Sequence, residues 1–319
     1  MEDAHVRRSG AHAADDNDSR DEVWRTLEER VQRIAFTVVS DEPPPLRGIP
    51  DSSGASANRP TSAQAAFARS LRALSDLDLP EVDLRLDLDA DPRLLADGWS
   101  RVAAGILPAF GIPGVITAEP AYAKAVDWML CAALRSVDPA SSTSYYFRVS
   151  QRPLNQGPFE AAAERLSEAV LRRQVITGAY RLVAGTTGHR PRVQLATVGS
   201  TIPETLEAAE ELEAQGIGAD VVDVVSADAV FAAWQRTTMR AVRSGTTPSI
   251  AGTLRQAFDP VSPLVTVHDQ GTATLAWLGS ALGVPTVTVG PSAGDGRASH
   301  AAPVDTPTIV SAALAALSF

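Results

Sequence analysis

The sequence of 319 residues contains one cysteine, Cys131, and one lysine, Lys124. A single cysteine excludes a disulfide framework within the chain and a cluster of thiolate metal ligands. Cys131 lies in the apolar run from Trp128 to Leu134. We therefore expect a buried, inert thiol, because a reactive cysteine needs an exposed and electropositive setting.

Long apolar runs are absent as well. No stretch approaches the roughly 18 uninterrupted apolar residues that a membrane-spanning helix needs. The N-terminus has charges and histidines but no apolar segment, so we expect no signal peptide. The net charge is -10 and the isoelectric point is about 5.0. This balance argues against nucleic acid and anionic membranes as partners and predicts an ordinary cytoplasmic protein.

Composition divides the chain into four segments. Residues 1–20 lack hydrophobic periodicity and are typical of a disordered tail. Residues 21–60 combine a short helix or strand with a linker rich in proline and serine. Two folded units follow, which we place at 61–152 and 153–319, and the chain is long enough for both to have cores.

The first unit mixes helical and strand patterns. Thr61 or Ser62 predicts the cap of a helix. Residues 81–89 alternate apolar and charged side chains, which predicts a strand with one wet face. Asp91 and the proline after it predict another helix start. The remaining patterns predict a strand at 112–117, a helix at 120–137 and a strand at 144–149.

The second unit alternates strands with helices. Apolar runs predict strands at 192–199, 220–225, 264–268 and 284–289. Helical patterns follow them at 201–216, 227–243, 272–282 and 306–317. Thr201 and Glu204 have the spacing of a capping box at the first of these helices. Such alternation predicts an α/β fold whose mostly parallel sheet is covered by helices.

Several strings of residues stand in the order of a known family. They are Ile112-Pro113-Gly114-Val115-Ile116, Glu119-Pro120-Ala121-Tyr122, Tyr145-Tyr146-Phe147-Arg148-Val149, Gly178-Ala179-Tyr180-Arg181-Leu182, Arg192-Val193-Gln194-Leu195, and Gly199-Ser200 followed by Glu207 to Leu212. Over 112–319 the chain resembles the C-terminal portion of the homodimeric bacterial pyruvate dehydrogenase decarboxylating component, a thiamine diphosphate enzyme of the transketolase family. The resemblance implies a shortened pyrimidine-binding domain at 61–152 and a transketolase-type C-terminal domain at 153–319.

The resemblance also implies which catalytic parts to look for. In the family, one domain binds diphosphate and a divalent metal through Gly-Asp-Gly and a later Asn-Asn, while another domain supplies a glutamate to the aminopyrimidine ring. Here Gly294-Asp295-Gly296 has no asparagine after it, and the segment for that glutamate is shortened between Asp89 and Asp97. We therefore expect no catalytic residue of the family, and thiamine diphosphate with magnesium only where a partner chain completes the site.

Four residues are candidates for binding a small ligand: Ser200, Thr201, His268 and Asp269. The first two stand at a helix start, where free amides attract anions, although helix capping explains them as well. His268 and Asp269 follow a predicted strand, and ligands of parallel sheets gather beyond the carboxyl ends of strands. Pairing with loop amides is the alternative for both. The sequence contains no metal-binding signature.

Three functions fit these observations. In the first, which we favour, the chain is a non-catalytic interaction or assembly subunit related to the pyruvate dehydrogenase component. In the second, it is one subunit of a split thiamine diphosphate enzyme of the 2-oxoacid decarboxylating or transketolase type. In the third, it is a domain that binds another small ligand near Ser200 and His268. We expect a homodimer or a heteromeric partner that carries a diphosphate-binding domain, because a domain that normally packs against others leaves apolar surface uncovered. Enzymatic activity stays open, since the chain is catalytically incomplete alone.

Overall fold

A computed structural model of the chain describes residues 60–75, 84–86, 102–105, 110–136, 144–291 and 304–319. Several expectations fall outside these residues: the tail at 1–20, nearly all of 21–60, the helix start at Asp91 and the turn at Gly294–Gly296. Within the described part, no helix combines the length and the apolar character needed to cross a bilayer.

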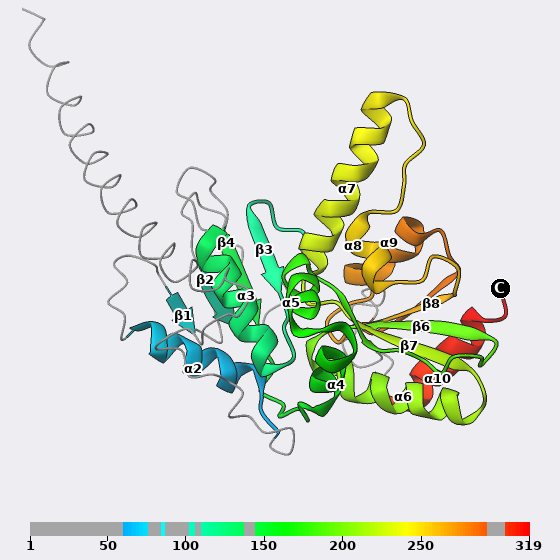
Figure 1. Cartoon of the computed structure of the whole chain (residues 1–319), viewed down its shortest axis with the longest axis horizontal. Helices are drawn as coiled ribbons and strands as arrows, with labels where there is room; N and C mark the ends of the chain where they lie inside the picture. The colour runs from blue at the N-terminus through cyan, green and yellow to red at the C-terminus, as the bar shows by residue number, and fades with distance from the viewer. Residues whose placement is uncertain (1–59, 76–83, 87–101, 106–109, 137–143, 292–303) are drawn as a thin grey trace, which may run out of the picture.

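The first unit contains a parallel sheet with the strand order β1-β2-β4-β3 (Figure 1). Its strands are β1 (Leu84–Leu86), β2 (Val102–Gly105), β3 (Val115–Ala118) and β4 (Ser144–Arg148). Helices α2 (Ala63–Ser75) and α3 (Ala123–Ser136) pack against each other beside it. The hydroxyl of Ser62 accepts a hydrogen bond from the N–H of Ala65 at 3.1 Å, which confirms the predicted cap of α2.

The second unit contains a five-stranded sheet with the order β5-β7-β6-β8-β9. Its strands are β5 (Tyr180–Val183), β6 (Arg192–Thr197), β7 (Gly218–Asp223), β8 (Leu264–Val267) and β9 (Thr286–Val289). All neighbours are parallel except β5 and β7, and central Leu195 is paired with Val221 on one side and Val265 on the other. The predicted α/β fold with a mostly parallel sheet is confirmed.

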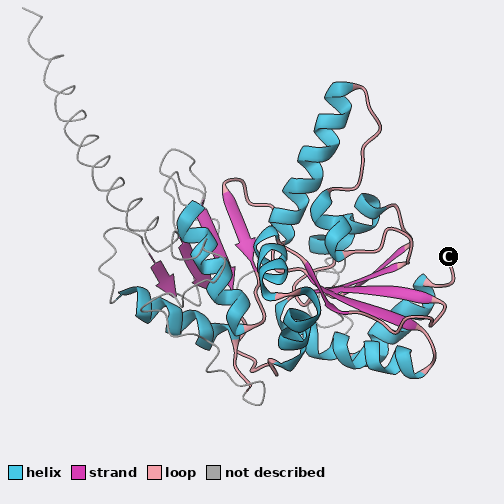
Figure 2. Ribbon diagram, in the orientation of Figure 1, coloured by secondary structure: helices cyan, strands magenta, loops and turns pink. Residues whose placement is uncertain are grey.

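Helices cover both faces of this sheet (Figure 2). They are α6 (Ile202–Ala214), α7 (Ala227–Ser244), α8 (Gly252–Ala257), α9 (Ala273–Leu282) and α10 (Thr306–Ala316). Leu195 packs in one core with α6 and α10, while its neighbour Ala196 packs in another with α7, α8 and α9. Successive side chains of a strand point to opposite faces, so a sheet covered on both sides needs the continuous apolar runs that the sequence has.

An aromatic cluster joins the two units. Helices α4 (Gly157–Leu166) and α5 (Glu168–Thr177) lie between the sheets in sequence, and Phe159 of α4 is fully buried. Its ring lies 5.2 Å from that of Tyr122, 5.6 Å from that of Trp128 and 5.7 Å from that of Tyr180, centroid to centroid. One core cluster therefore runs from α3 of the first unit to β5 of the second.

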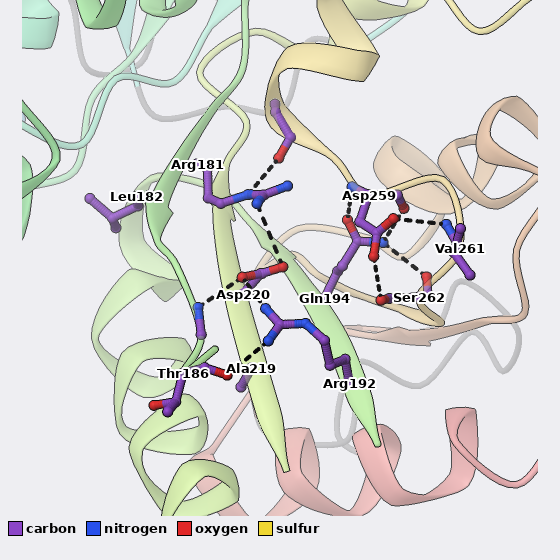
Figure 3. Close-up of polar contacts among 12 residues, drawn as sticks. Arg181, Leu182, Thr186, Arg192, Gln194, Ala219, Asp220, Asp259, Val261 and Ser262 are labelled. Atoms are coloured by element: carbon purple, nitrogen blue, oxygen red, sulfur yellow. Dashed lines mark hydrogen bonds and ion pairs between the residues drawn. The ribbon is translucent and has the colours of Figure 1, made fainter. Parts of the chain in front are cut away.

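The short antiparallel strand β5 was not among the predicted strands. Long-range polar contacts fix it at the edge of the sheet, beside β7 (Figure 3). Buried Asp220 accepts hydrogen bonds from the N–H of Gly185 at 2.8 Å and from Arg192 at 2.9 Å. Arg181 of β5 lies 3.9 Å from the same carboxylate and donates to the carbonyl of Ala257. Because these partners are distant in sequence, a local pattern does not identify the strand.

The structure corrects two local expectations. The capping box is wrong: the residues Gly199–Thr201 form a 3₁₀ turn, and the Thr201 hydroxyl donates to the carbonyl of Val198 at 2.8 Å instead of capping α6. Glu204 pairs with Arg152, so it does not reach back to the turn. Cys131 is half-buried rather than fully buried, and it packs against the core.

The contact between α9 and β9 generates a prediction. A Cβ atom at Gly279 would lie 2.8 Å from the Cβ of Thr286, which is closer than packed side chains tolerate. Gly279→Ala should therefore lower the free energy of unfolding by about 1–3 kcal/mol, although alanine favours helices. Urea unfolding measures the change. The matched control is Gly252→Ala in α8, which has open space around it and should be neutral or stabilising; equal effects of both substitutions would contradict the prediction.

Candidate functional site

The candidate site lies where the carboxyl ends of the two sheets meet. Glu119 directly follows β3, and Arg148 is the last residue of β4 in the first sheet. In the second sheet, Ser200 lies in the turn after β6, and His268 and Asp269 directly follow β8. Parallel strands end at one edge of a sheet, and here two such edges face each other.

Hydrogen bonds from backbone and side-chain groups hold the two edges together. The N–H of Glu119 donates to the carbonyl of Val225 at 2.6 Å, and the hydroxyl of Ser226 donates to the carbonyl of Thr117 at 2.6 Å. The carboxylate of Asp228 accepts from the N–H groups of Gly111 and Thr117 at 3.0 and 2.9 Å. Ser226 also caps α7. The start of α7 is thus fastened to β3 of the other sheet.

Arg148 bridges the two units. Its guanidinium donates to Oε2 of Glu119 at 2.5 Å and to Oδ2 of Asp269 at 2.7 Å. The hydroxyl of Ser200 donates to the same Oδ2 of Asp269 at 2.5 Å. The side chain of Arg148 is 11% exposed, and those of Glu119 and Asp269 are 10% and 25% exposed. Ionised hydrogen bonds of this kind are short and strong when water is excluded.

The imidazole of His268 completes the cluster. The ring is buried, and its Nδ1 accepts a hydrogen bond from the N–H of Gln270 at 3.0 Å. A nitrogen that accepts a hydrogen bond carries no proton, so the proton of the neutral ring is assigned to Nε2. Nε2 faces Oε1 of Glu119 at 3.4 Å, which is longer than a good hydrogen bond.

Arg148 keeps both carboxyl groups ionised. Burial alone would raise the pKa of Glu119, but the charge of Arg148 and the contact with His268 outweigh it and hold the pKa below its usual value. Burial likewise opposes ionisation of Asp269, and the hydrogen bond and charge of Arg148, followed by the hydrogen bond of Ser200, lower its pKa. Burial disfavours the Arg148 cation, yet Glu119 and Asp269 raise its pKa above the ordinary value.

A metal ion does not fit this arrangement. One ligand atom each from Glu119, His268 and Asp269 lies within 4.8 Å of the others, which is the spacing of a metal site. However, His268 uses Nδ1 as an acceptor and carries its proton on Nε2, so neither nitrogen offers a free lone pair. Arg148 already supplies the cation between the two carboxylates. The geometry favours an ion-pair network.

Only a small cleft opens beside the network. Its volume is about 100 Å³, against roughly 300–1,000 Å³ for common ligand sites. Its lining residues are Glu119, Arg148, Val149, Ser150, Gln151, Gly199, Ser200 and Asp269.

Three of the four predicted site residues come together here. Ser200 and Asp269 are hydrogen bonded and line the cleft, and His268 lies behind Glu119. The Thr201 hydroxyl is buried with those of Thr197 and Thr205 and does not line it.

Glu119 and Arg148 were not among the predicted site residues. Each stands at the carboxyl end of a strand, as His268 does. That position at a strand end was the one feature of the sequence that could have identified them as site residues. They pair with each other and with His268 and Asp269 of the other sheet, and nothing local in the sequence identifies these partners.

The described residues do not fit thiamine diphosphate. Glu119 is the one buried glutamate among them, and it is held ionised by Arg148. Asn155 is the one asparagine among them, and its side chain accepts from the N–H of Gly157 at 3.0 Å, at the start of α4. Neither is available for the family's pyrimidine or metal contacts, and the cleft is too small for the cofactor.

A second buried carboxyl lies next to the network. Asp223 ends β7 and is fully buried, and its Oδ2 accepts from the hydroxyl of Tyr180 at 2.8 Å. Within the described part of the chain, its Oδ1 has no hydrogen-bond partner. Burial raises the pKa of Asp223 to about 7, and the charge of Glu119 adds to that rise, while the Tyr180 hydrogen bond opposes it.

Comparisons with known proteins place this fold. Residues 185–240 match the family model of the transketolase C-terminal domain. A transketolase complex with sedoheptulose-7-phosphate from Pichia stipitis is similar with a TM-score of 0.53 and 12% identity, over 94% of this chain and 52% of that one. A transketolase from Campylobacter jejuni is similar with a TM-score of 0.53 and 13% identity, over 93% of this chain and 53% of that one.

A split-gene transketolase, an inactive β4 tetramer, gives a TM-score of 0.47 and 14% identity, over 81% of this chain and 99% of that one. No curated protein matches the sequence. The chain thus has a transketolase-like C-terminal domain and spans about half the length of the two full transketolases. Identities this low concern the fold alone. The likeness to the pyruvate dehydrogenase component stays a prediction.

The Arg148 bridge generates a prediction about stability. Arg148→Met keeps an unbranched apolar stem but leaves the buried Glu119 and the half-buried Asp269 without their cation. The free energy of unfolding at pH 7 should fall by about 3 kcal/mol or more, as measured by urea unfolding. Arg152→Met is the matched control, because the Arg152–Glu204 pair is largely exposed on the arginine side, and its loss should cost less than about 1 kcal/mol.

The same variant has a defined pH dependence. The lowered pKa values of Glu119 and Asp269 give the wild type stability that is present above the unfolded-state values and lost as the pH falls through the folded-state values. Without Arg148 this contribution is absent. The difference between wild type and Arg148→Met should therefore shrink from pH 7 to pH 3, and a constant difference would contradict the bridge.

Asp223 should act in the opposite direction. Because its pKa is raised to about 7 in the folded state, its stabilising proton is fully present below the unfolded pKa and is lost as the pH rises through 7. Asp223→Asn should be more stable than wild type at pH 8, by up to about 4 kcal/mol at about 1.4 kcal/mol per pKa unit. The gain should vanish near pH 4. Unfolding curves at both pH values test this, and a pH-independent gain would refute it.

Proposed function

We propose that the protein is a non-catalytic assembly subunit of a transketolase-type complex, related to the pyruvate dehydrogenase decarboxylating component. One observation carries the proposal. At the carboxyl ends of both sheets, where α/β proteins keep their ligands, the polar side chains are paired with one another through Arg148.

This pairing suits a structural junction better than a catalytic centre. A general acid or base needs a pKa near the working pH and access to a substrate. The bridge instead keeps Glu119 and Asp269 ionised, and the hydroxyl of Ser200 is engaged with Asp269. The charged side chains of Glu119, Arg148 and Asp269 therefore hold the two units together.

The two alternative functions have less support from the geometry of this site. As a subunit of a split thiamine diphosphate enzyme, the chain would need both the cofactor's metal site and the pyrimidine-binding glutamate from a partner. A small ligand near Ser200 and His268 would have to enter a cleft of about 100 Å³ and compete with the Ser200–Asp269 hydrogen bond. A ligand there stays a prediction.

Two measurements test the proposal. Calorimetric titration of the full chain with thiamine diphosphate and magnesium should give no binding at micromolar concentrations, because the described residues offer neither the pyrimidine nor the metal contacts. Light scattering at tens of micromolar, or of the complex purified from source cells, should give a stoichiometric particle larger than the 33.5 kDa chain. Micromolar cofactor binding would favour the split enzyme, and a strict monomer in both preparations would refute an assembly role.

A further inference from the structure

Helix α7 projects from the body of the second unit (Figure 1). Its first half is anchored by an aromatic cluster: the ring of Phe231 lies 5.0 Å from that of Trp277, 5.5 Å from that of Trp234 and 5.9 Å from that of Phe110. From Gln235 onward most of its side chains are exposed. We call the segment 235–244 the arm.

The arm carries basic and apolar side chains together. Arg236, Arg240 and Arg243 are exposed at spacings of four and three residues, which places them on one side of the helix. Met239 lies beside this stripe and Val242 further round the helix, and they are 49% and 61% exposed. A shallow hollow of about 670 Å³ runs along the arm, lined by the three arginines and Met239 with their neighbours. A basic stripe is a local exception on a chain of net charge -10.

A complementary surface lies on α6 and α10. Glu207, Glu210 and Glu211 are exposed at spacings of three and one residues, on one side of α6. The two helices lie side by side (Figure 1), and the hydroxyl of Thr306 at the start of α10 donates to Glu207 at 2.9 Å. The far end of α10 exposes Leu314, at 42%. We call the exposed surface of these two helices the acidic face.

We propose that the arm docks on the acidic face of a second copy of this chain. Each surface combines charge of one sign with exposed apolar side chains, and the two signs are opposite. Charge complementarity of this kind selects partners and fixes their register, while the apolar contacts add affinity. The inference rests on the proposed assembly role and names the chain itself as the partner.

The arm and the acidic face lie on different parts of one molecule, so each copy offers one of each (Figure 1). Two copies that exchange arms form a closed dimer, whereas a one-way contact continues into a longer chain. Both arrangements use the same pair of surfaces. Sedimentation velocity separates them by mass, and either one is consistent with the proposal.

Charge reversal tests the pairing. Variant A carries Arg236→Glu and Arg240→Glu, so its arm and its face are both acidic. Variant B carries Glu210→Arg and Glu211→Arg, so both are basic. Each variant alone should associate roughly tenfold or more weakly than wild type, because like charges now meet. An equimolar mixture of A and B should associate again, since every contact between unlike copies then joins opposite charges.

The controls separate this inference from the assembly role. Arg255→Glu changes an exposed arginine on α8, outside the arm, and should leave self-association unchanged. Wild-type self-association should weaken between 50 mM and 500 mM salt, because exposed charges are screened. Variants that assemble as wild type does would overturn this surface and leave the assembly role standing. A wild-type chain that stays monomeric alone but co-purifies with a different protein would also overturn it.

Discussion

The salt bridge from Arg148 to Glu119 and Asp269 is the interaction on which the arrangement of the two units depends. Each carboxylate belongs to a different sheet, so one guanidinium ties the end of β3 to the end of β8. Burying three charges is costly, and a geometry with short, direct hydrogen bonds on both sides is what makes it tolerable. The hydrogen bonds of the Glu119 N–H and the Ser226 hydroxyl and the aromatic contacts of Phe159 act at the same junction.

This bridge sets the charge of the groups that lie at the two facing sheet edges. A site at facing sheet edges needs groups that change protonation or open toward a ligand. The guanidinium instead lowers the pKa of both carboxyls and occupies the space between them. Asp223 ends β7, which β6 separates from β8, and among the described residues it has no cationic partner; burial raises its pKa to about 7. Asp223 and Asp269 thus differ in two respects: Asp223 is more deeply buried, and Asp269 has Arg148 and Ser200 as hydrogen-bond donors.

The sequence predicted much of the fold because the second unit repeats one local pattern, an apolar strand followed by an amphipathic helix. Apolar runs buried on both faces, such as that around Leu195, are unmistakable where helices alternate with them. Prediction failed where a tertiary contact overrides a local motif. Thr201 and Glu204 have capping-box spacing, yet the Thr201 hydroxyl contacts the Thr197 hydroxyl and the Val198 carbonyl, and Glu204 pairs with Arg152. For the site, Ser200, His268 and Asp269 were predictable as strand-end residues, whereas Arg148 gains its role only when two sheets face each other.

The junction between the two sheets and the arm are connected through the start of helix α7. Ser226 caps α7 and Asp228 lies in its first turn, and both residues are hydrogen bonded to the first unit at Thr117. The direction of α7 is therefore set where the sheets are joined, and the aromatic cluster around Phe231 stiffens it before it leaves the body. A projecting helix that is free to move would lose conformational entropy when it docks. A helix that is already held in place loses less. The hydrogen bonds of Ser226 and Asp228 thus give rigidity to the arm that we propose as a docking surface.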